Sequence, residues 1–175
     1  MKSEMPAEII AAAKGLKRQA SFVSAGRRIG TLVMSDGIGD RWKLEDEPNG
    51  YKYFLFFAQW NSESLKELKL LEKLSEKMNG MVRCYAVCCD ADFISFKKYL
   101  SASQKSPVTY LYAGCNPLID DECALKLIPD ALFLDENNKT MMPHTPLPSG
   151  RLEEYFKRIT DDNKRPVKGR KSWNN

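Results

Sequence analysis

Residues 51–80 read YKYFLFFAQWNSESLKELKLLEKLSEKMNG, and this stretch decides how the rest of the chain folds. Its first part, Tyr51–Ala58, is almost continuously apolar, which is typical of a strand buried on both faces of a sheet. Its second part carries apolar residues at steps of three or four, which predicts an amphipathic helix over Asn61–Asn79. The repeating positions are Leu65, Leu68, Leu71, Leu74 and Met78. The stretch therefore predicts a central strand that runs directly into a helix.

The predicted helix begins with residues that suit its free backbone N–H groups. Asn61 and Ser62 are favourable N-cap residues, and Glu63 in the first turn complements the positive end of the helix dipole. Trp60 stands between the strand and the helix, and Gly80 ends the helix. The junction thus joins a strand end, a large aromatic residue and a capped helix N-terminus.

The remaining apolar runs predict further strands. Met81–Cys89 follows the helix, so strand, helix and strand form a right-handed parallel crossover. Asp130–Leu134 is predicted as another strand, with Lys139–Met142 paired on the sheet edge, and Val108–Ala113 as a short strand or extended segment. Two short apolar runs predict a hairpin that precedes the main sheet. They are Ile29–Met34 and Trp42–Leu44.

Helical spacing and breaker residues predict the other helices. These cover Pro6–Ala20, Phe93–Leu100, a short segment from Asn116, and Gly150–Thr160. Asp90 and Asp92 are expected to cap the helix at Phe93. Together, strands and helices alternate as in an α/β domain.

Two segments resemble the TlpA/ResA-like thiol-disulfide oxidoreductases, an AhpC/TSA-related branch of the thioredoxin-like superfamily. The segment 58–64, AQWNSES, is similar to their A-x-W-C-x-x-C signature. The segment 127–139, LIPDALFLDENNK, is similar to their cis-proline strand and the turn after it. The resemblance implies a thioredoxin-like fold, with a central mixed β-sheet flanked by helices and with an N-terminal hairpin and helix. It also implies a cis peptide bond between Ile128 and Pro129.

The sequence departs from this signature at both redox positions. Asn61 stands where the family has its nucleophilic cysteine, and Ser64 where it has the resolving cysteine. Thiol-disulfide exchange needs a thiolate that attacks and a second thiol that resolves the mixed disulfide. An amide and a hydroxyl cannot perform these steps, so the usual site is expected to be inactive.

The resemblance implies a first functional hypothesis, a redox-inactive binding or scaffold module. In the family, the backbone beside the cis-proline pairs with an extended substrate segment, and such pairing needs no thiol. The expected binding residues are Trp60, Asn61, Ile128 and Pro129, and the expected partner is a protein or peptide in extended conformation.

The alternative hypothesis is a thiol-disulfide oxidoreductase of cell-envelope redox homeostasis that uses other cysteines. Cys115 and Cys123 flank a polar segment and are candidates for a loop disulfide. Cys88 and Cys89 end a predicted strand, where they would form a strained vicinal disulfide or offer one reactive thiol near Trp60, or simply pack as small buried residues like Cys84. Both hypotheses remain open at this point.

No metal or cofactor is expected. The spacing of Cys88, Cys89, Cys115 and Cys123 fits no common zinc motif, and His144 has no second histidine to complete a site. His144 is expected to be exposed to solvent.

Length and composition indicate one domain of ordinary size. The chain has 175 residues, of which 43% are hydrophobic, enough for a sizeable core. The net charge of +4 is modest, so no nucleic-acid partner is expected. We expect an N-terminal helix and lead-in over 1–28, a thioredoxin-like domain over 29–160, and a basic, mobile tail over 161–175.

The sequence shows no apolar run long enough to cross a bilayer, so no membrane span is expected. Its first residues lack the pattern of a signal peptide, which taken literally indicates the cytoplasm. If a signal segment has been removed, the resemblance instead implies the periplasm or cell envelope.

Overall fold

The computed structural model describes residues 25–102, 106–123, 125, 127–142 and 145–164. The predicted helix Pro6–Ala20 and the residue His144 lie outside this part of the chain. The elements, in chain order, are β1 (Val33–Asp36), β2 (Arg41–Lys43), the 3-10 helix η1 (Leu44–Asp46), β3 (Tyr51–Phe57), α2 (Ser62–Met78), β4 (Val82–Cys88), α3 (Phe93–Ala102), β5 (Thr109–Tyr112), α4 (Pro117–Cys123), β6 (Asp130–Leu134) and α5 (Leu152–Lys164).

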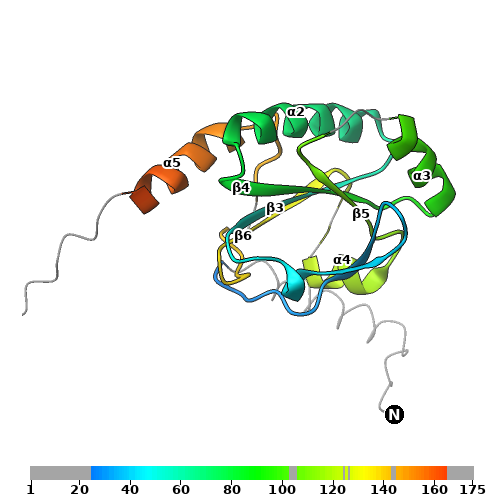
Figure 1. The fold of residues 1–175 in the computed structure, drawn as a ribbon, viewed down its shortest axis with the longest axis horizontal. Coiled ribbons are helices and arrows are strands. Elements are labelled where there is room, and N and C mark those ends of the chain that lie inside the picture. The colour runs from blue at the N-terminus through cyan, green and yellow to red at the C-terminus, as the bar shows by residue number, and fades with distance from the viewer. Residues whose placement is uncertain (1–24, 103–105, 124, 126, 143–144, 165–175) are drawn as a thin grey trace, which may run out of the picture.

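Within the described residues, the strands form one six-stranded mixed sheet in the order β2-β1-β5-β4-β3-β6 (Figure 1). β4 pairs in parallel with both β3 and β5, whereas β6 runs antiparallel to β3. β3 therefore lies between two paired strands, which confirms the predicted interior position of Tyr51–Phe57. The parallel pairs bring the carboxyl ends of β3, β4 and β5 to one edge of the sheet.

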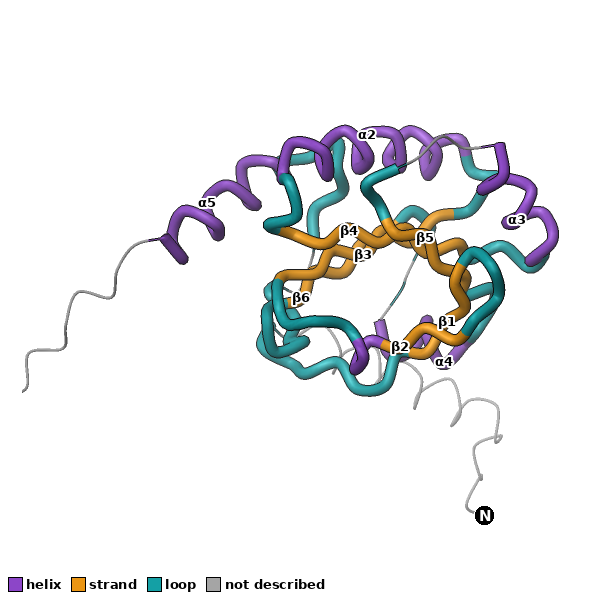
Figure 2. Tube along the Cα trace, in the orientation of Figure 1, coloured by secondary structure: helices purple, strands orange, loops and turns teal. Residues whose placement is uncertain are grey.

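Helices cover both faces of this sheet. Figure 1 shows α2, α3 and α5 on one side and α4 on the other, and Figure 2 shows the strands, in orange, between these helices. The period-two alternation of β3 explains the two layers, because Tyr53, Leu55 and Phe57 belong to the core under α2, whereas Phe54 and Phe56 belong to the core on the α4 side. Both cores are thus built from one strand that is buried on both faces.

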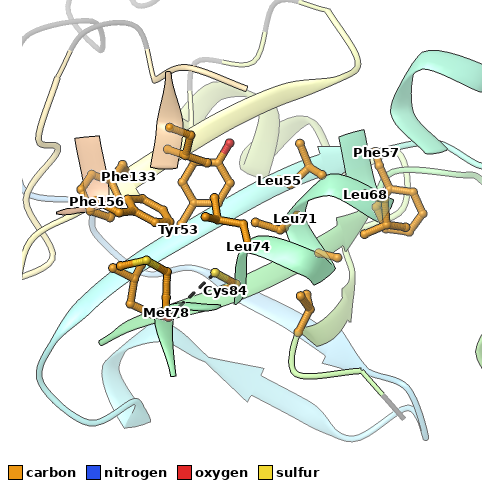
Figure 3. Close-up of a cluster of buried hydrophobic side chains, with 14 of the residues drawn as sticks. Tyr53, Leu55, Phe57, Leu68, Leu71, Leu74, Met78, Cys84, Phe133 and Phe156 are labelled. Atoms are coloured by element: carbon orange, nitrogen blue, oxygen red, sulfur yellow. Dashed lines mark hydrogen bonds between the residues drawn. The ribbon is translucent and has the colours of Figure 1, made fainter. Parts of the chain in front are cut away.

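Phe133 occupies the centre of an aromatic group in the core under α2 and α5 (Figure 3). Its ring centroid lies 5.2 Å from that of Phe156 and 6.3 Å from that of Tyr53. Tyr53 also donates a hydrogen bond to the Pro146 carbonyl oxygen at 2.9 Å. These contacts fix β6, and with it the segment that precedes β6, against the centre of the sheet.

The predicted hairpin forms, but it is part of the main sheet rather than an element that precedes it. Besides pairing with β2, β1 pairs antiparallel with β5, with Ser35 opposite Tyr112. The turn is held by Asp36, whose Oδ1 accepts hydrogen bonds from three backbone N–H groups at 2.8–2.9 Å. An unpaired β5 edge would leave backbone groups without partners, and β1 satisfies them.

After β6, the structure differs from the sequence prediction in one strand and in one helix end. Lys139–Met142 forms no strand, only isolated bridges, because Thr140 pairs with Leu134 while its N–H donates to the Arg27 carbonyl at 2.8 Å. Helix α5 continues to Lys164 instead of ending at Thr160. The hydrogen bonds of an α-helix join backbone groups, so its last turn can form without apolar side chains. The point where apolar residues stop recurring in the sequence therefore did not mark the end of α5. Residues 165–175 lie outside the described part of the chain.

Candidate functional site

Asn61 joins the N-terminus of α2 to the loop before β6. Its Oδ1 accepts hydrogen bonds from the N–H groups of Glu63 at 3.0 Å and Ser64 at 3.3 Å, which confirms the predicted N-cap. Its Nδ2 donates to the Ile128 carbonyl oxygen at 2.7 Å. The peptide bond between Ile128 and Pro129 is cis, as predicted. One side chain therefore holds together two segments that lie far apart in the sequence.

Large apolar side chains are exposed beside both segments. Trp60, next to Asn61, is 77% exposed, and Leu127, next to Ile128, is 79% exposed. An isolated exposed apolar residue is ordinary, but here each of the two segments that the Asn61–Ile128 hydrogen bond joins carries one. The structure thus brings all four predicted binding residues to one place at the carboxyl edge of the sheet.

Ser64 lies beneath this junction rather than on it. Its side chain is fully buried, and its Oγ has no hydrogen-bond partner within the described part of the chain. A buried hydroxyl without a partner costs about 1–3 kcal/mol relative to an apolar group. The Ser64 hydroxyl therefore neither forms a hydrogen bond that holds the junction nor reaches the surface where a partner would bind.

Replacing Ser64 with alanine is expected to raise the free energy of unfolding by about 1 kcal/mol, because it removes the unpaired hydroxyl. Urea denaturation would measure the change. Ser75 is the matched control, since it is buried in the same helix but donates to the Pro107 carbonyl at 3.4 Å. Ser75→Ala should be less favourable than Ser64→Ala, and equal changes would contradict the prediction.

Asp90 belongs to the site, although its place in the sequence predicts another role. It was expected to help cap α3, but Asp92 alone does so, accepting from Ile94 N–H at 2.9 Å and from Ser95 Oγ at 2.7 Å. These bonds lower the pKa of the Asp92 carboxyl. Asp90 instead lies two residues after the end of β4, beside the β3–α2 junction, and too early in the chain to cap α3. The only signal in the sequence was an acidic residue directly after a strand end.

The Asp90 carboxylate is buried and ties β4 to the junction. Its Oδ2 accepts from the Gln59 N–H at 2.9 Å and lies 3.2 Å from Cys88 Sγ. Its Oδ1 is buried without a partner among the described residues. Asp90 therefore holds the backbone just ahead of Trp60, at the start of the site.

All five cysteines are free, and Cys88 and Cys89 face opposite sides of the sheet. Cys88 belongs to the core under α2, whereas Cys89 packs against the core on the α4 side. Burial raises the pKa of the Cys88 thiol to about 12 and also raises that of Cys89. The hypothesis of a vicinal Cys88–Cys89 disulfide is thus wrong for this structure, because successive side chains of a strand point apart.

Cys115 and Cys123 are likewise not bridged. Cys115 precedes α4, and Cys123 is its last residue. A helix of seven residues is about 10 Å long, whereas a disulfide requires Cα atoms within about 7 Å. The predicted loop disulfide is therefore absent from this structure, in which helix α4 lies between the two cysteines along the chain.

The structure instead brings Cys115 to Cys89. The Cys115 thiol lies 3.7 Å from the Cys89 carbonyl oxygen, and both residues line a pocket of about 200 Å³ beside Ile128. Asp120 and Leu127 also line it. The sequence pattern did not predict this pair, although residues after neighbouring parallel strands are expected to meet at one edge of the sheet.

No group of three or more histidine, cysteine or acidic side chains arranged to bind a metal ion occurs within the described ranges. Among the helices that the structure describes, none combines the length and apolar character needed to cross a membrane.

Several solved structures are similar to this fold. A Bacteroides vulgatus protein with a provisional assignment as a thiol-disulfide oxidoreductase superposes with a TM-score of 0.71 at 20% identity, over 79% of this chain and 99% of that one. A Chlorobium tepidum protein with a provisional assignment as the thiol:disulfide interchange protein DsbE gives 0.65 at 18% identity, over 79% and 96%. An exposed lipoprotein thioredoxin from Streptococcus pneumoniae gives 0.59 at 16% identity, over 74% and 99%. No protein-family model and no curated protein matches the sequence.

These similarities, together with the mixed sheet between helices, show that the chain has a thioredoxin-like fold. The predicted fold class is therefore confirmed. At this level of identity the neighbours share the fold with this chain, and their oxidoreductase names describe those proteins.

Proposed function

We propose that this thioredoxin-fold chain is a polypeptide-binding module. Its site, formed by Trp60, Asn61, Ile128 and Pro129, holds a partner segment in extended conformation without thiol-disulfide exchange at α2. The observation that carries the proposal is the Asn61 side chain, which bonds both the first N–H groups of α2 and the Ile128 carbonyl. This amide orders the junction without supplying a nucleophile.

The chemistry of the junction supports binding rather than exchange. In the resemblance to A-x-W-C-x-x-C, Asn61 takes the position of the attacking thiol and Ser64 that of the resolving thiol. Exchange needs both sulfur atoms. The N–H groups that would stabilise a thiolate already bond to the Asn61 Oδ1. The site therefore keeps its architecture, because the Asn61 side chain bonds both the helix and the loop.

The edge of β6 offers backbone groups to a partner strand. β6 pairs with β3 on one side, and on its other side the described residues provide only the bridge between Leu134 and Thr140, at the end far from Pro129. Near its start, the Ala131 N–H bonds to the Asp130 side chain at 2.8 Å, a local bond that a partner carbonyl can replace. An extended segment that adds to this edge would lie beside Trp60 and Leu127.

Binding can be tested with reduced, carboxymethylated α-lactalbumin, an unfolded chain without free thiols. We expect this probe to shift the NMR signals of the Trp60 indole, the Asn61 amide side chain and the Ala131 N–H of the isotope-labelled protein. Trp60→Ala should weaken binding about tenfold, since one buried aromatic contact is worth roughly 1–2 kcal/mol. The matched control is Ile38→Ala, an equally exposed apolar residue in the β1–β2 turn. Absence of binding, or equal loss in the two variants, would contradict the proposal.

A second function, thiol-disulfide exchange, is favoured by one specific observation. Cys115 is an exposed thiol that lines the pocket beside Ile128, next to the proposed peptide site. We propose that any oxidoreductase activity, as named for the structural neighbours, runs through Cys115 and not through Asn61 or Ser64. The exposed lipoprotein among those neighbours supports the proposal of a periplasmic or cell-envelope location.

A further inference from the structure

We infer that Cys89 and Cys115 form a redox pair, in which Cys115 attacks a small disulfide and Cys89 resolves the product to an intramolecular Cys89–Cys115 disulfide. This inference rests on the second function proposed above, because it assigns the partner thiol for exchange at Cys115. It places the pair in the pocket of about 200 Å³ beside Ile128.

The distance between the two residues supports the pair. The Cys115 Sγ lies 3.7 Å from the Cys89 carbonyl oxygen. A carbonyl oxygen lies about 2.4 Å from the Cα of its own residue, so Cys115 Sγ lies within roughly 6 Å of Cys89 Cα. In a disulfide this separation is shorter, and the Cα atoms themselves lie about 5.5–6 Å apart. Closing the bond therefore requires a rotation of the side chains and a movement of the loop that carries Cys115.

The loop that carries Cys115 is anchored at a position that favours this movement. The N–H groups of Ala113 and Gly114 both donate to the Cys88 carbonyl, at 2.9 and 3.1 Å. These bonds hold the end of β5 next to the end of β4. Cys115 follows directly and is exposed, so it can move while its neighbours stay fixed.

The surroundings of the two thiols set the order of reaction. Cys115 is exposed and open to a dissolved disulfide, whereas Cys89 is partly buried. Burial raises the pKa of the Cys89 thiol, and Cys88, Asp120, Asp90 and Cys115 raise it further. The accessible Cys115 therefore reacts first, and the shielded Cys89 reacts with a sulfur that is already next to it.

The reaction with a disulfide R–S–S–R balances in two steps. The Cys115 thiolate attacks one sulfur, the S–S bond breaks, and the departing thiolate takes up a proton to leave as R–SH. The Cys89 thiol then loses its proton and attacks the Cys115 sulfur of the mixed disulfide, which releases the second R–SH. Two protein thiols are oxidised to one disulfide, and one small disulfide is reduced to two thiols.

The other cysteines are less suitable partners for Cys115. Cys88 and Cys84 lie in the core under α2, on the opposite face of the sheet from Cys89. Cys123 packs on the same face as Cys89, but it ends α4 and does not line the pocket that Cys89 and Cys115 share. Cys89, by contrast, lines the same pocket as the exposed Cys115 thiol.

Cystamine is a suitable probe, because it is a cationic disulfide and the acidic Asp120 lines the pocket. After cystamine treatment, alkylation and mass spectrometry, we expect the wild-type chain to lose two thiols and to yield a peptide pair joined through Cys89 and Cys115. Cys89→Ser should stop at a cysteamine adduct on Cys115. Cys123→Ser, the matched control, should form the same Cys89–Cys115 disulfide as the wild type.

The outcomes distinguish the inference from the function on which it rests. A stable adduct on Cys115 in the wild-type chain, or a disulfide between Cys115 and Cys123, would overturn the pair while leaving exchange at Cys115 in place. Failure of Cys115 to react with cystamine would overturn both. Circular dichroism of each variant, compared with the wild type, shows that any lost reaction comes from the missing thiol and not from unfolding.

Discussion

The double substitution Asn61→Cys and Ser64→Cys, made in a Cys115→Ser background, is expected to give the chain disulfide reductase activity. Insulin reduction by dithiothreitol should match the uncatalysed rate with Cys115→Ser alone and exceed it about tenfold with all three substitutions. A thiol at a helix N-terminus can have a pKa near 7 instead of about 8.5, which raises its thiolate fraction at neutral pH by roughly that factor.

The geometry of the junction supplies what the two thiols need. Replacing Asn61 removes the Oδ1 that now occupies the N–H groups of Glu63 and Ser64, so these groups become free to stabilise a thiolate. Residues three apart at a helix start lie about 5–6 Å from each other, within the reach of a disulfide. Ser64 is fully buried, so its cysteine replacement is shielded, as suits a resolving thiol.

Single substitutions separate the roles of the two positions. Asn61→Cys alone, in the same Cys115→Ser background, should accumulate a mixed disulfide and turn over slowly, because no second thiol resolves it. Ser64→Cys alone should match the uncatalysed rate. If the triple variant is no faster than Cys115→Ser, the prediction is wrong. The N-terminus of α2 then does not activate a thiol at position 61, although the segment resembles the A-x-W-C-x-x-C signature.

The sequence predicted most reliably those features that depend on neighbouring residues alone. Tyr51–Phe57 is buried on both faces, and its unbroken apolar run indicated this directly. The N-cap at Asn61 could also be predicted, because capping depends on one side chain and the nearest backbone N–H groups. The Asn61 bond to Ile128 was not, since it joins residues 67 positions apart.

The cysteines show why the rest could not be predicted. Pairing them by closeness in the sequence suggested Cys88 with Cys89 and Cys115 with Cys123. Strand alternation places the first two on opposite faces of the sheet, and the other two are both free. The sequence predicted a strand over Met81–Cys89, and successive side chains of a strand point to opposite faces of the sheet. This alone could have excluded a disulfide between Cys88 and Cys89. The approach of Cys115 to Cys89 depends on how β5 pairs with β4, which local pattern does not determine.

Asn61→Ala is expected to lower the free energy of unfolding by about 2 kcal/mol, roughly 1 from the lost N-cap and 1 from the lost hydrogen bond to Ile128. Asn61→Asp separates these contributions, because a carboxylate still caps α2 but cannot donate to the Ile128 carbonyl. Asn61→Asp should lower the free energy of unfolding by about 1 kcal/mol, less the stabilisation that a negative charge gains at the N-terminus of a helix.

Urea denaturation of the three chains should therefore rank the wild type above Asn61→Asp and Asn61→Asp above Asn61→Ala. The peptide site responds differently, since both substitutions free the Ile128 carbonyl for a partner strand but also release the loop that presents it. If Asn61 orders this loop for binding, both variants should bind carboxymethylated α-lactalbumin more weakly than the wild type although Asn61→Asp keeps the cap. Full binding by Asn61→Asp would show instead that Asn61 acts on the helix alone, and that the loop before β6 is held in place by the packing of Phe133 in the core.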